Sequence, residues 1–282
     1  MIAHTSENYN LLLQDAIEGM KLMPDNSFDL CIADPPYGAS TKANWNYDES
    51  KKLNGFGGSW KLLSENWDLL SSNDIFQSSF LWLSELKRLV KPTGSIWIHA
   101  TYHNAGFVNV ICQMLGLEII NEVVWYKRNA FPNLSARRLT ASHETILWVH
   151  TGGAKREYAF NYEDAKKARF LGDNLKEPDK QLRTVWDIPN NKQKEELALG
   201  SHPTQKPLRV SERLLMISGL KGGKLLVPFA GSGTEMIAGM GVRCPINLVR
   251  GDRGAHWTDG VGGSGSPVQS HKQLLHWEQA AA

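Results

Sequence analysis

The sequence predicts an α/β protein built on a parallel or mostly parallel sheet. Short apolar runs of strand length alternate with longer stretches whose apolar residues recur every three or four positions, as in amphipathic helices. Strands that alternate with helices in this way form a sheet covered by helices. With 282 residues, 41% hydrophobic and 21% charged, the chain has the composition of an ordered protein and not of a disordered or fibrous one.

The first half of the chain carries most of the expected elements. Two prolines end the apolar run at residues 28–33. Residues 72–74 can cap a helix that begins at residue 75, and a Lys-Pro-Thr-Gly segment at 91–94 ends it. The expected elements are helices at about 16–22, 75–90 and 105–115, and strands at 28–33, 95–100, 118–126 and 144–149. Residues 39–66 have no clear period and are expected to form a long loop.

The pattern changes after residue 126. Residues 127–200 are basic, rich in Asn and interrupted by Pro, which fits an inserted or appended subdomain. Regular elements then return as a helix at 207–220, a strand at 224–228 and a helix at 235–240. A flexible tail is expected at the end, because residues 251–267 are dominated by Gly and small polar residues.

Composition and charge restrict the classes of protein. No apolar stretch approaches the roughly 20 residues that cross a bilayer, and residues 1–8 lack the features of a signal peptide, so we expect a cytoplasmic protein without a membrane partner. Three cysteines without C-x-x-C spacing predict buried thiols and no metal site. The net charge is only +2, but residues 126–209 contain 16 Lys and Arg against 10 Asp and Glu. Such an excess is also typical of a solvated surface.

The first motif with chemical content follows the strand at residues 28–33. It consists of Asp34, Pro35, Pro36 and Tyr37. Asp34 and the Pro35 carbonyl can each accept one N–H from an exocyclic amine, and Tyr37 can stack on the ring that carries it. The motif therefore predicts a pocket for a planar amine, the alternative being a surface turn with a buried tyrosine.

The second motif is a glycine-rich turn between an apolar run and a helix. It consists of Phe229, Ala230, Gly231, Ser232, Gly233 and Thr234. Such a turn lets the backbone approach a ligand closely and directs helix N-terminal amides toward it. It is neither a phosphate-binding loop nor a complete G-x-G-x-x-G fingerprint, because position 236 is Met. A simple tight turn is the alternative.

In this order, the two motifs resemble those of S-adenosylmethionine-dependent amino methyltransferases of DNA, in the β-arranged group. The resemblance extends over about residues 8–241. This part of the chain is similar to the cell-cycle-regulated adenine methyltransferases of bacteria and their restriction-modification relatives. The further matching segments are Tyr102-His103-Asn104, Trp125-x-Lys127, Pro132-Asn133, His143-Glu144-Thr145, Phe160-Asn161-Tyr162 and His202-Pro203-Thr204-Gln205-Lys206-Pro207.

The resemblance implies a Rossmann-like class I methyltransferase fold with a mixed, mostly parallel sheet, circularly permuted relative to other groups. Residues 8–126 would be the catalytic half, 127–200 a target-recognition region, 201–243 the cofactor-binding half and 244–282 an atypical tail. It also implies S-adenosylmethionine as cofactor. The residues implied in its binding are Asp15, Ala16, Asp34, Thr204, Lys206 and the turn from Phe229 to Thr234.

The resemblance further implies double-stranded DNA as partner and adenine N6 as the methylated atom, with the base flipped out of the duplex. The DNA site would be a short one containing adenine, GANTC being one such sequence. The basic residues proposed to contact DNA are Lys127, Arg128, Arg137, Arg138, Lys166, Lys167 and Arg169. A bacterial or phage-encoded, nucleoid-associated enzyme is implied, and a homodimer is left open. His143 and Glu144 are interpreted as structural and not as a metal pair.

The sequence departs from the family after Arg243. Val227 stands where relatives often carry an acidic residue, and no carboxylate that could hold the ribose appears between Arg243 and Asp252. Pro245 is expected to interrupt the final strand. One hypothesis is a shifted reading frame after Arg243, and sequencing of the gene tests it. The other is that Asp252 replaces the missing carboxylate, in which case Asp252→Ala weakens cofactor binding.

Three other functions remain open from the sequence. Cytosine N4-methylation uses the same chemistry, although such enzymes more often carry Ser at the position of Asp34. Protein glutamine methyltransferases usually carry Asn there. A non-catalytic DNA-binding relative is conceivable because the ribose carboxylate is missing. Cytosine C5-methylation is disfavoured, because no Pro-Cys motif is present.

Overall fold

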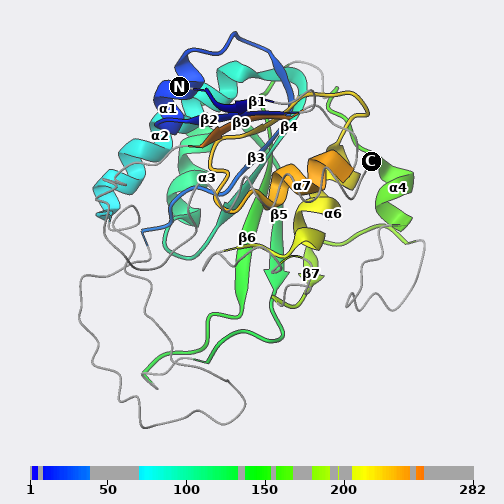
Figure 1. Ribbon diagram of the computed structural model, residues 1–282. Helices are drawn as coiled ribbons and strands as arrows, with labels where there is room; N and C mark the ends of the chain where they lie inside the picture. The colour runs from blue at the N-terminus through cyan, green and yellow to red at the C-terminus, as the bar shows by residue number, and fades with distance from the viewer. Residues whose placement is uncertain are drawn as a thin grey trace.

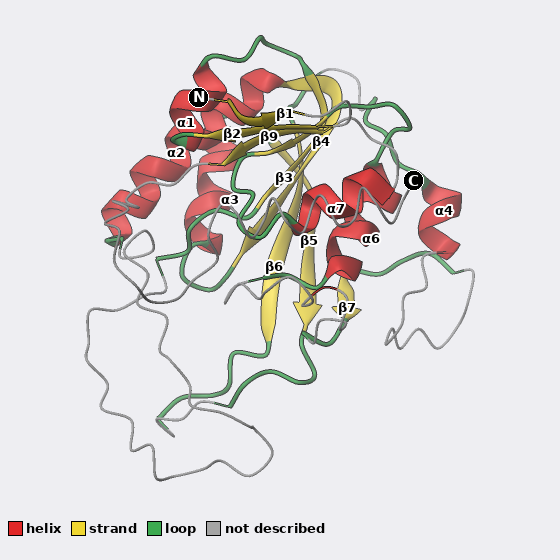
Figure 2. Ribbon diagram, viewed as in Figure 1, coloured by secondary structure: helices red, strands yellow, loops and turns green. Residues whose placement is uncertain are grey.

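The computed structural model shows a nine-stranded sheet with helices on both faces (Figures 1 and 2). The structure describes residues 2–5, 9–38, 70–132, 137–153, 157–167, 180–190, 196, 205–241 and 246–250. In spatial order, the strands are β1 (Ile2–Thr5), β2 (Tyr9–Leu13), β9 (Ile246–Arg250), β8 (Leu225–Val227), β3 (Phe28–Ala33), β4 (Val90–Ala100), β6 (His143–His150), β5 (Glu118–Tyr126) and β7 (Val185–Asp187).

The sheet is mixed and mostly parallel, as predicted. Neighbouring strands are parallel except at three places: β1 against β2, β4 against β6, and β6 against β5. The strand β6 therefore runs opposite to both of its neighbours. Near the other edge of the sheet, β9 lies between β2 and β8, so that the first and last described strands of the chain are close together.

Helices cover the two faces in separate groups. The described helices are α1 (Ala16–Lys21), α2 (Ser72–Leu89), α3 (Ala105–Met114), α4 (Tyr162–Lys167), α6 (Leu208–Ser218) and α7 (Thr234–Gly241). Buried residues of α1, α2 and α3 share one core cluster with one face of the sheet. Those of α4, α6 and α7 share a second cluster with the opposite face, as Figure 2 shows. The sheet thus separates two apolar cores.

Strong local signals placed several elements correctly. The strand β3 has the predicted bounds, because the two prolines after Ala33 end the ladder. The helix α2 begins three residues earlier than predicted. Its N-cap is Ser71, whose hydroxyl accepts a hydrogen bond from the N–H of Asp74 while the carboxylate of Asp74 accepts one from the N–H of Ser71.

The segment at residues 127–200 is continuous with the central sheet at two strands. The strand β6 lies between β4 and β5, and β7, which was not predicted, pairs with β5. Within its described residues the segment is therefore not a wholly separate subdomain. The short elements β1 and α4 were also not predicted, because four to six residues give little periodicity.

The expectation that Pro245 interrupts the last strand was wrong. The strand β9 begins at Ile246 and pairs in parallel with β2 over residues 246–250 and with β8 over residues 246–248. A proline that precedes a strand removes no hydrogen bond from its ladder. The candidate ribose contact Asp252 and the rest of the predicted tail lie outside the described residues.

No helix within the described ranges is both long and apolar enough to span a membrane. Cys31 and Cys112 are free and buried, as predicted, and burial raises the pKa of both thiols, that of Cys112 to about 12. Cys244 lies outside the described residues.

Candidate active site

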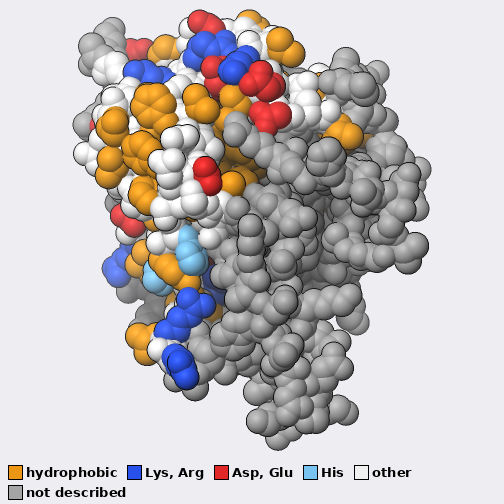
Figure 3. Space-filling view, turned by 90° about the vertical axis from the view of Figure 1, so that its left-hand side faces the viewer, with side chains coloured by type: hydrophobic (Ala, Val, Ile, Leu, Met, Phe, Trp, Pro, Cys, Tyr) orange, Lys and Arg blue, Asp and Glu red, His pale blue; other side chains and the backbone are white. Residues whose placement is uncertain are grey.

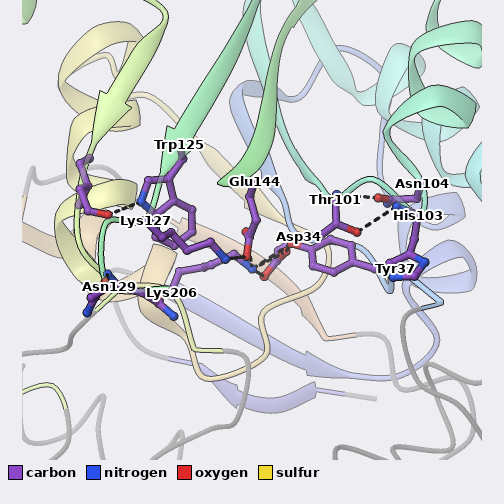
Figure 4. Close-up of polar contacts among 12 residues, drawn as sticks. Asp34, Tyr37, Thr101, His103, Asn104, Trp125, Lys127, Asn129, Glu144 and Lys206 are labelled. Carbon is purple, nitrogen blue, oxygen red and sulfur yellow. Dashed lines mark hydrogen bonds and ion pairs between the residues drawn. The ribbon is translucent and has the colours of Figure 1, made fainter. Parts of the chain in front are cut away.

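The candidate site lies along the edge of the sheet that is formed by the ends of its strands, where β3, β4 and β5 end and β6 begins. Asp34 follows β3 directly, Lys127 follows β5, and Glu144 is the second residue of β6. Because β6 is antiparallel to its neighbours, its first residues reach the same edge as the ends of the other three strands. Figure 4 shows the side chains of Asp34, Glu144, Lys127 and Lys206 converging there.

Four ionisable side chains at this edge lie on the same face of the sheet. Side chains alternate between faces along a strand, so residues two positions apart share a face. The neighbours two positions away belong to the core under α6 and α7, and they are Ile32, Trp97, Trp125 and Ile146. The four side chains, here called the ionisable row, are Asp34, His99, Lys127 and Glu144.

Lys206 lies across this row. It is located just before α6, and its ammonium group is 2.7 Å from Oδ2 and 2.9 Å from Oδ1 of Asp34. The same nitrogen is 2.9 Å from the hydroxyl of Tyr37 and 3.7 Å from Oε2 of Glu144. The side chain of Lys206 is only 5% exposed. A buried cation thus connects the Asp-Pro-Pro-Tyr motif with β6.

Tyr37 is bound to both partners. Its hydroxyl donates a hydrogen bond to Oδ1 of Asp34, and the ammonium of Lys206 lies 5.1 Å from the centre of its ring. Burial, together with the negative charge of Asp34, raises the pKa of Tyr37 well above its usual value. Tyr37 therefore stays a neutral hydrogen-bond donor at physiological pH.

Glu144 binds a second lysine. Its Oε1 accepts a hydrogen bond of 2.6 Å from Lys127, and both side chains are largely buried. Burial is the largest single influence on Asp34 and Glu144 and opposes their ionisation. The charge of Lys206 and the hydrogen bonds that each carboxylate accepts, joined at Glu144 by the charge of Lys127, together outweigh burial and hold the pKa of each carboxyl below its usual value. Burial likewise opposes the charge of Lys206, whereas Asp34 and Glu144 raise its pKa. All three groups are charged at neutral pH.

His99 is fully buried within the row. Neither of its ring nitrogens has a hydrogen-bond partner among the described residues. Burial lowers its pKa to about 4, and the nearby charge of Asp34 opposes this only in part. The ring is thus neutral, with polar atoms beside Asp34. His99 could not be predicted from the sequence, because it lies inside an apolar strand run.

The glycine-rich turn follows β8, the strand beside β3. Gly231 and Gly233 have φ values of +48° and +82°, which residues with side chains rarely adopt. A Cβ on Gly231 would meet no atom within 4 Å, so the backbone there borders open space. The hydroxyl of Thr234 lies 3.5 Å from the carbonyl of Lys206, which connects the turn to the segment that carries this lysine. The local geometry fits a ligand held by backbone atoms.

Glu235 lies in the first turn of α7, behind this turn. It is buried and accepts a hydrogen bond of 3.3 Å from Ser211. Burial, reinforced by the charge of Asp34, raises the pKa of Glu235 to about 7. The carboxyl therefore titrates near physiological pH.

Other predicted cofactor residues are found in different settings. Asp15 is the N-cap of α1 and accepts hydrogen bonds from the N–H groups of Ile17 and Glu18. It follows β2, which is separated from β8 by β9 at the same edge of the sheet. Ala16 is buried. Thr204 lies outside the described residues.

The predicted DNA-binding residues are not equivalent. Lys127 is largely buried against Glu144, so its charge is already paired inside the site. Arg128 pairs with Asp187, Lys166 with Glu163, and Arg138 bonds to the hydroxyl of Tyr102 at 2.7 Å. Arg137 is exposed. Arg169 and the side chain of Lys167 lie outside the described residues.

Tyr102, His103 and Asn104 form the turn between β4 and α3. The side-chain oxygen of Asn104 accepts a hydrogen bond of 2.9 Å from the N–H of Thr101, and the Thr101 hydroxyl accepts one from the N–H of His103 (Figure 4). These bonds fix the shape of the turn that follows β4. On the face shown in Figure 3, Lys and Arg side chains at the lower end lie next to His, whereas those at the upper end are mixed with Asp and Glu.

Comparisons with known proteins agree with this geometry. The family model N6_N4_Mtase, described as DNA methylase, matches residues 28–240. Type II methyltransferase M.HinfI of Haemophilus influenzae is 34% identical over 231 residues, covering 79% of this chain and 59% of that protein. Type II methyltransferase M2.DpnII of Streptococcus pneumoniae is 34% identical over 226 residues, covering 79% of this chain and 78% of that protein. The crystal structure of the M1.HpyAVI–SAM complex superposes with a TM-score of 0.54 at 19% identity, covering 87% of this chain and 94% of that chain.

The fold is therefore the Rossmann-like fold of the S-adenosylmethionine-dependent methyltransferases, which confirms the fold predicted from the sequence. The chain belongs to the N6_N4_Mtase family of DNA methylases.

Proposed function

We propose that this protein methylates the exocyclic N6 of adenine in a specific DNA sequence, with S-adenosylmethionine as methyl donor. The observation that carries the proposal is the position of the Asp-Pro-Pro-Tyr motif. It follows β3, immediately beside the glycine-rich turn that follows β8. An amine acceptor and a backbone cradle thus share one edge of the sheet, where ligands of such folds bind.

The residues at the glycine-rich turn fit the proposed cofactor. The positive φ values of Gly231 and Gly233 expose the backbone, and the open space at Gly231 leaves room for a ligand. Asp15, Ala16, Thr204, Lys206 and the turn from Phe229 to Thr234 are the proposed contacts. When bound, S-adenosylmethionine supplies a methyl group already activated on a sulfonium.

Asp34, Pro35 and Tyr37 act on the base. An exocyclic amine is a weak nucleophile, because its lone pair is delocalised into the ring. Hydrogen bonds from its two N–H groups to the carboxylate of Asp34 and the carbonyl of Pro35 favour a more tetrahedral nitrogen and stabilise the positive charge that develops there. Tyr37 holds the ring plane, and Pro36 keeps the turn rigid. Alignment of nitrogen and methyl then supplies much of the rate.

We propose double-stranded DNA as the partner, with the target base flipped out at a cost of roughly a few kcal/mol. The exposed arginines near Tyr102, and not the buried Lys127, are the better candidates for phosphate or base contacts. Residues 127–200 as target-recognition region, a cytoplasmic location and the oligomeric state belong to the same proposal.

The test is identification of the product. Unmethylated genomic DNA is incubated with the protein and S-adenosylmethionine carrying a labelled methyl group, and the nucleosides are analysed by mass spectrometry. We expect labelled N6-methyladenine, absent with Asp34→Ala and retained with the control Asp25→Ala, which removes an exposed carboxylate at the opposite end of β3 from the motif. Labelled N4-methylcytosine would show the other activity of the family, and no label in DNA would overturn the proposal.

A further inference from the structure

Lys206 occupies the groups that the proposed reaction needs. Its ammonium contacts both carboxylate oxygens of Asp34 and lies over the ring of Tyr37. An amine with two N–H groups requires the same oxygens, and a stacked base requires the same ring. The ammonium must therefore leave this position before a base can bind productively.

Glu144 offers a second place for this ammonium. Its Oε2 lies 3.7 Å from Nζ of Lys206, is buried, and has no hydrogen-bond partner within the described part of the chain. Its Oε1 is fixed by Lys127 at 2.6 Å. A shift of about 1 Å would bring the ammonium to the usual length of a charge-assisted hydrogen bond, about 2.7–2.9 Å.

The unpartnered oxygen argues for more than a structural ion pair. A buried carboxylate oxygen without a donor costs stability, so a purely structural Glu144 would be expected to have both oxygens satisfied. The long stem of Lys206 can change rotamer between two acceptors on the same sheet face. Such a shift never leaves the buried cation unpaired, which would be costly.

We propose that Glu144 is a positioning residue that takes the ammonium of Lys206 from Asp34 when the target amine binds. The inference rests on the proposed function. Asp34 is thereby freed for the amine and Tyr37 for the base ring, while Lys127 keeps Glu144 in place. Lys206 thus competes with the target amine for Asp34, and Glu144 sets the strength of that competition.

The first experiment compares Glu144→Gln with Glu122→Gln, an exposed change on β5. DNA binding is measured with the nonreactive analogue sinefungin, using duplexes that carry either adenine or purine, which lacks the exocyclic amine, at the methylated position. We expect wild type and Glu122→Gln to prefer adenine, and Glu144→Gln to lose at least about fivefold of this preference. The affinity for the purine duplex and for sinefungin should change less than twofold.

Repeating the comparison in a Lys206→Met variant separates a positioning role of Glu144 from a role in folding. In Lys206→Met, no ammonium competes for Asp34, so adding Glu144→Gln should leave the adenine preference unchanged. Glu144→Asp, which keeps the charge, should restore part of the preference. Equal losses from Glu144→Gln with and without Lys206 would overturn the proposal, as would a wild-type preference in Glu144→Gln. Failure of the wild type to methylate DNA would instead overturn the proposed function.

Discussion

The ammonium of Lys206 and the carboxylate of Asp34 form a buried ion pair with distances of 2.7 and 2.9 Å, although 172 residues separate them in the chain. The pair joins the segment before α6 to the end of β3. It also gives the Asp-Pro-Pro-Tyr motif a cationic partner that cannot be predicted from the motif alone. The charge state and accessibility of Asp34 thus depend on a distant part of the sequence.

Glu235 should make stability depend on pH. Its pKa is about 7 in the folded protein against 4.5 for an ordinary glutamate, so between these values the folded state holds a proton that the unfolded state has lost. Unfolding free energy therefore falls as pH rises through this window, by up to about 3 kcal/mol. Glu235→Gln should gain stability relative to wild type between pH 5 and pH 8, measured by urea unfolding. The exposed change Glu122→Gln should show no such gain. If the unfolding free energies of Glu235→Gln and wild type differed by the same amount at pH 5 and pH 8, the raised pKa of Glu235 would be contradicted.

Gly231→Ala should separate strain from ligand binding. Gly231 and Gly222 both have positive φ, at +48° and +76°, and a Cβ on either meets no atom within 4 Å. Each alanine variant should lose about 1 kcal/mol of stability from the backbone conformation alone. Only Gly231→Ala should also weaken the binding of S-adenosylmethionine, measured by calorimetry, because Gly222 lies in the turn before β8. Equal cofactor affinities in the two variants would argue against the glycine-rich turn as the cofactor site.

Arg138→Ala should weaken DNA binding. Arg138 is exposed and lies against Tyr102, next to the site, whereas Lys21 is exposed on α1 and paired with Glu18. If Arg138 contacts a phosphate, its removal lowers the slope of log affinity against log salt by about 1. Lys21→Ala should leave both affinity and slope unchanged. The measurement is fluorescence anisotropy of a labelled duplex at several salt concentrations, and a wild-type slope for Arg138→Ala would exclude the phosphate contact.

Sequence reasoning succeeded where signals are local. The run from Phe28 to Ala33 followed by two prolines defined β3, and the alternation of strands and helices defined the class of sheet. The strand β7 could not be predicted, because three residues carry no period, and β9 forms although Pro245 next to it predicts an interruption. Whether a strand forms at these two places depends on its pairing partners, which are β5 for β7, and β2 and β8 for β9.

The candidate site could be predicted only in part. The Asp-Pro-Pro-Tyr motif and the glycine-rich turn are contiguous in sequence and were recognised. The ionisable row depends on the register of four strands, so the sequence indicates only a structural role for Glu144 and gives no signal at His99. Lys127 was assigned to DNA contacts because it is basic, but the structure buries it against Glu144.

The most direct test of the account is the single-turnover rate of methyl transfer by Asp34→Asn on the target duplex. The substitution keeps the size of the side chain but replaces one acceptor oxygen with a donor and removes the charge. The account predicts a rate at least about 100-fold below wild type, as for loss of one preorganised stabilising group. It also predicts that the affinity for S-adenosylmethionine stays within a fewfold of wild type. A rate close to that of wild type would contradict the role of Asp34 as acceptor of the target amine.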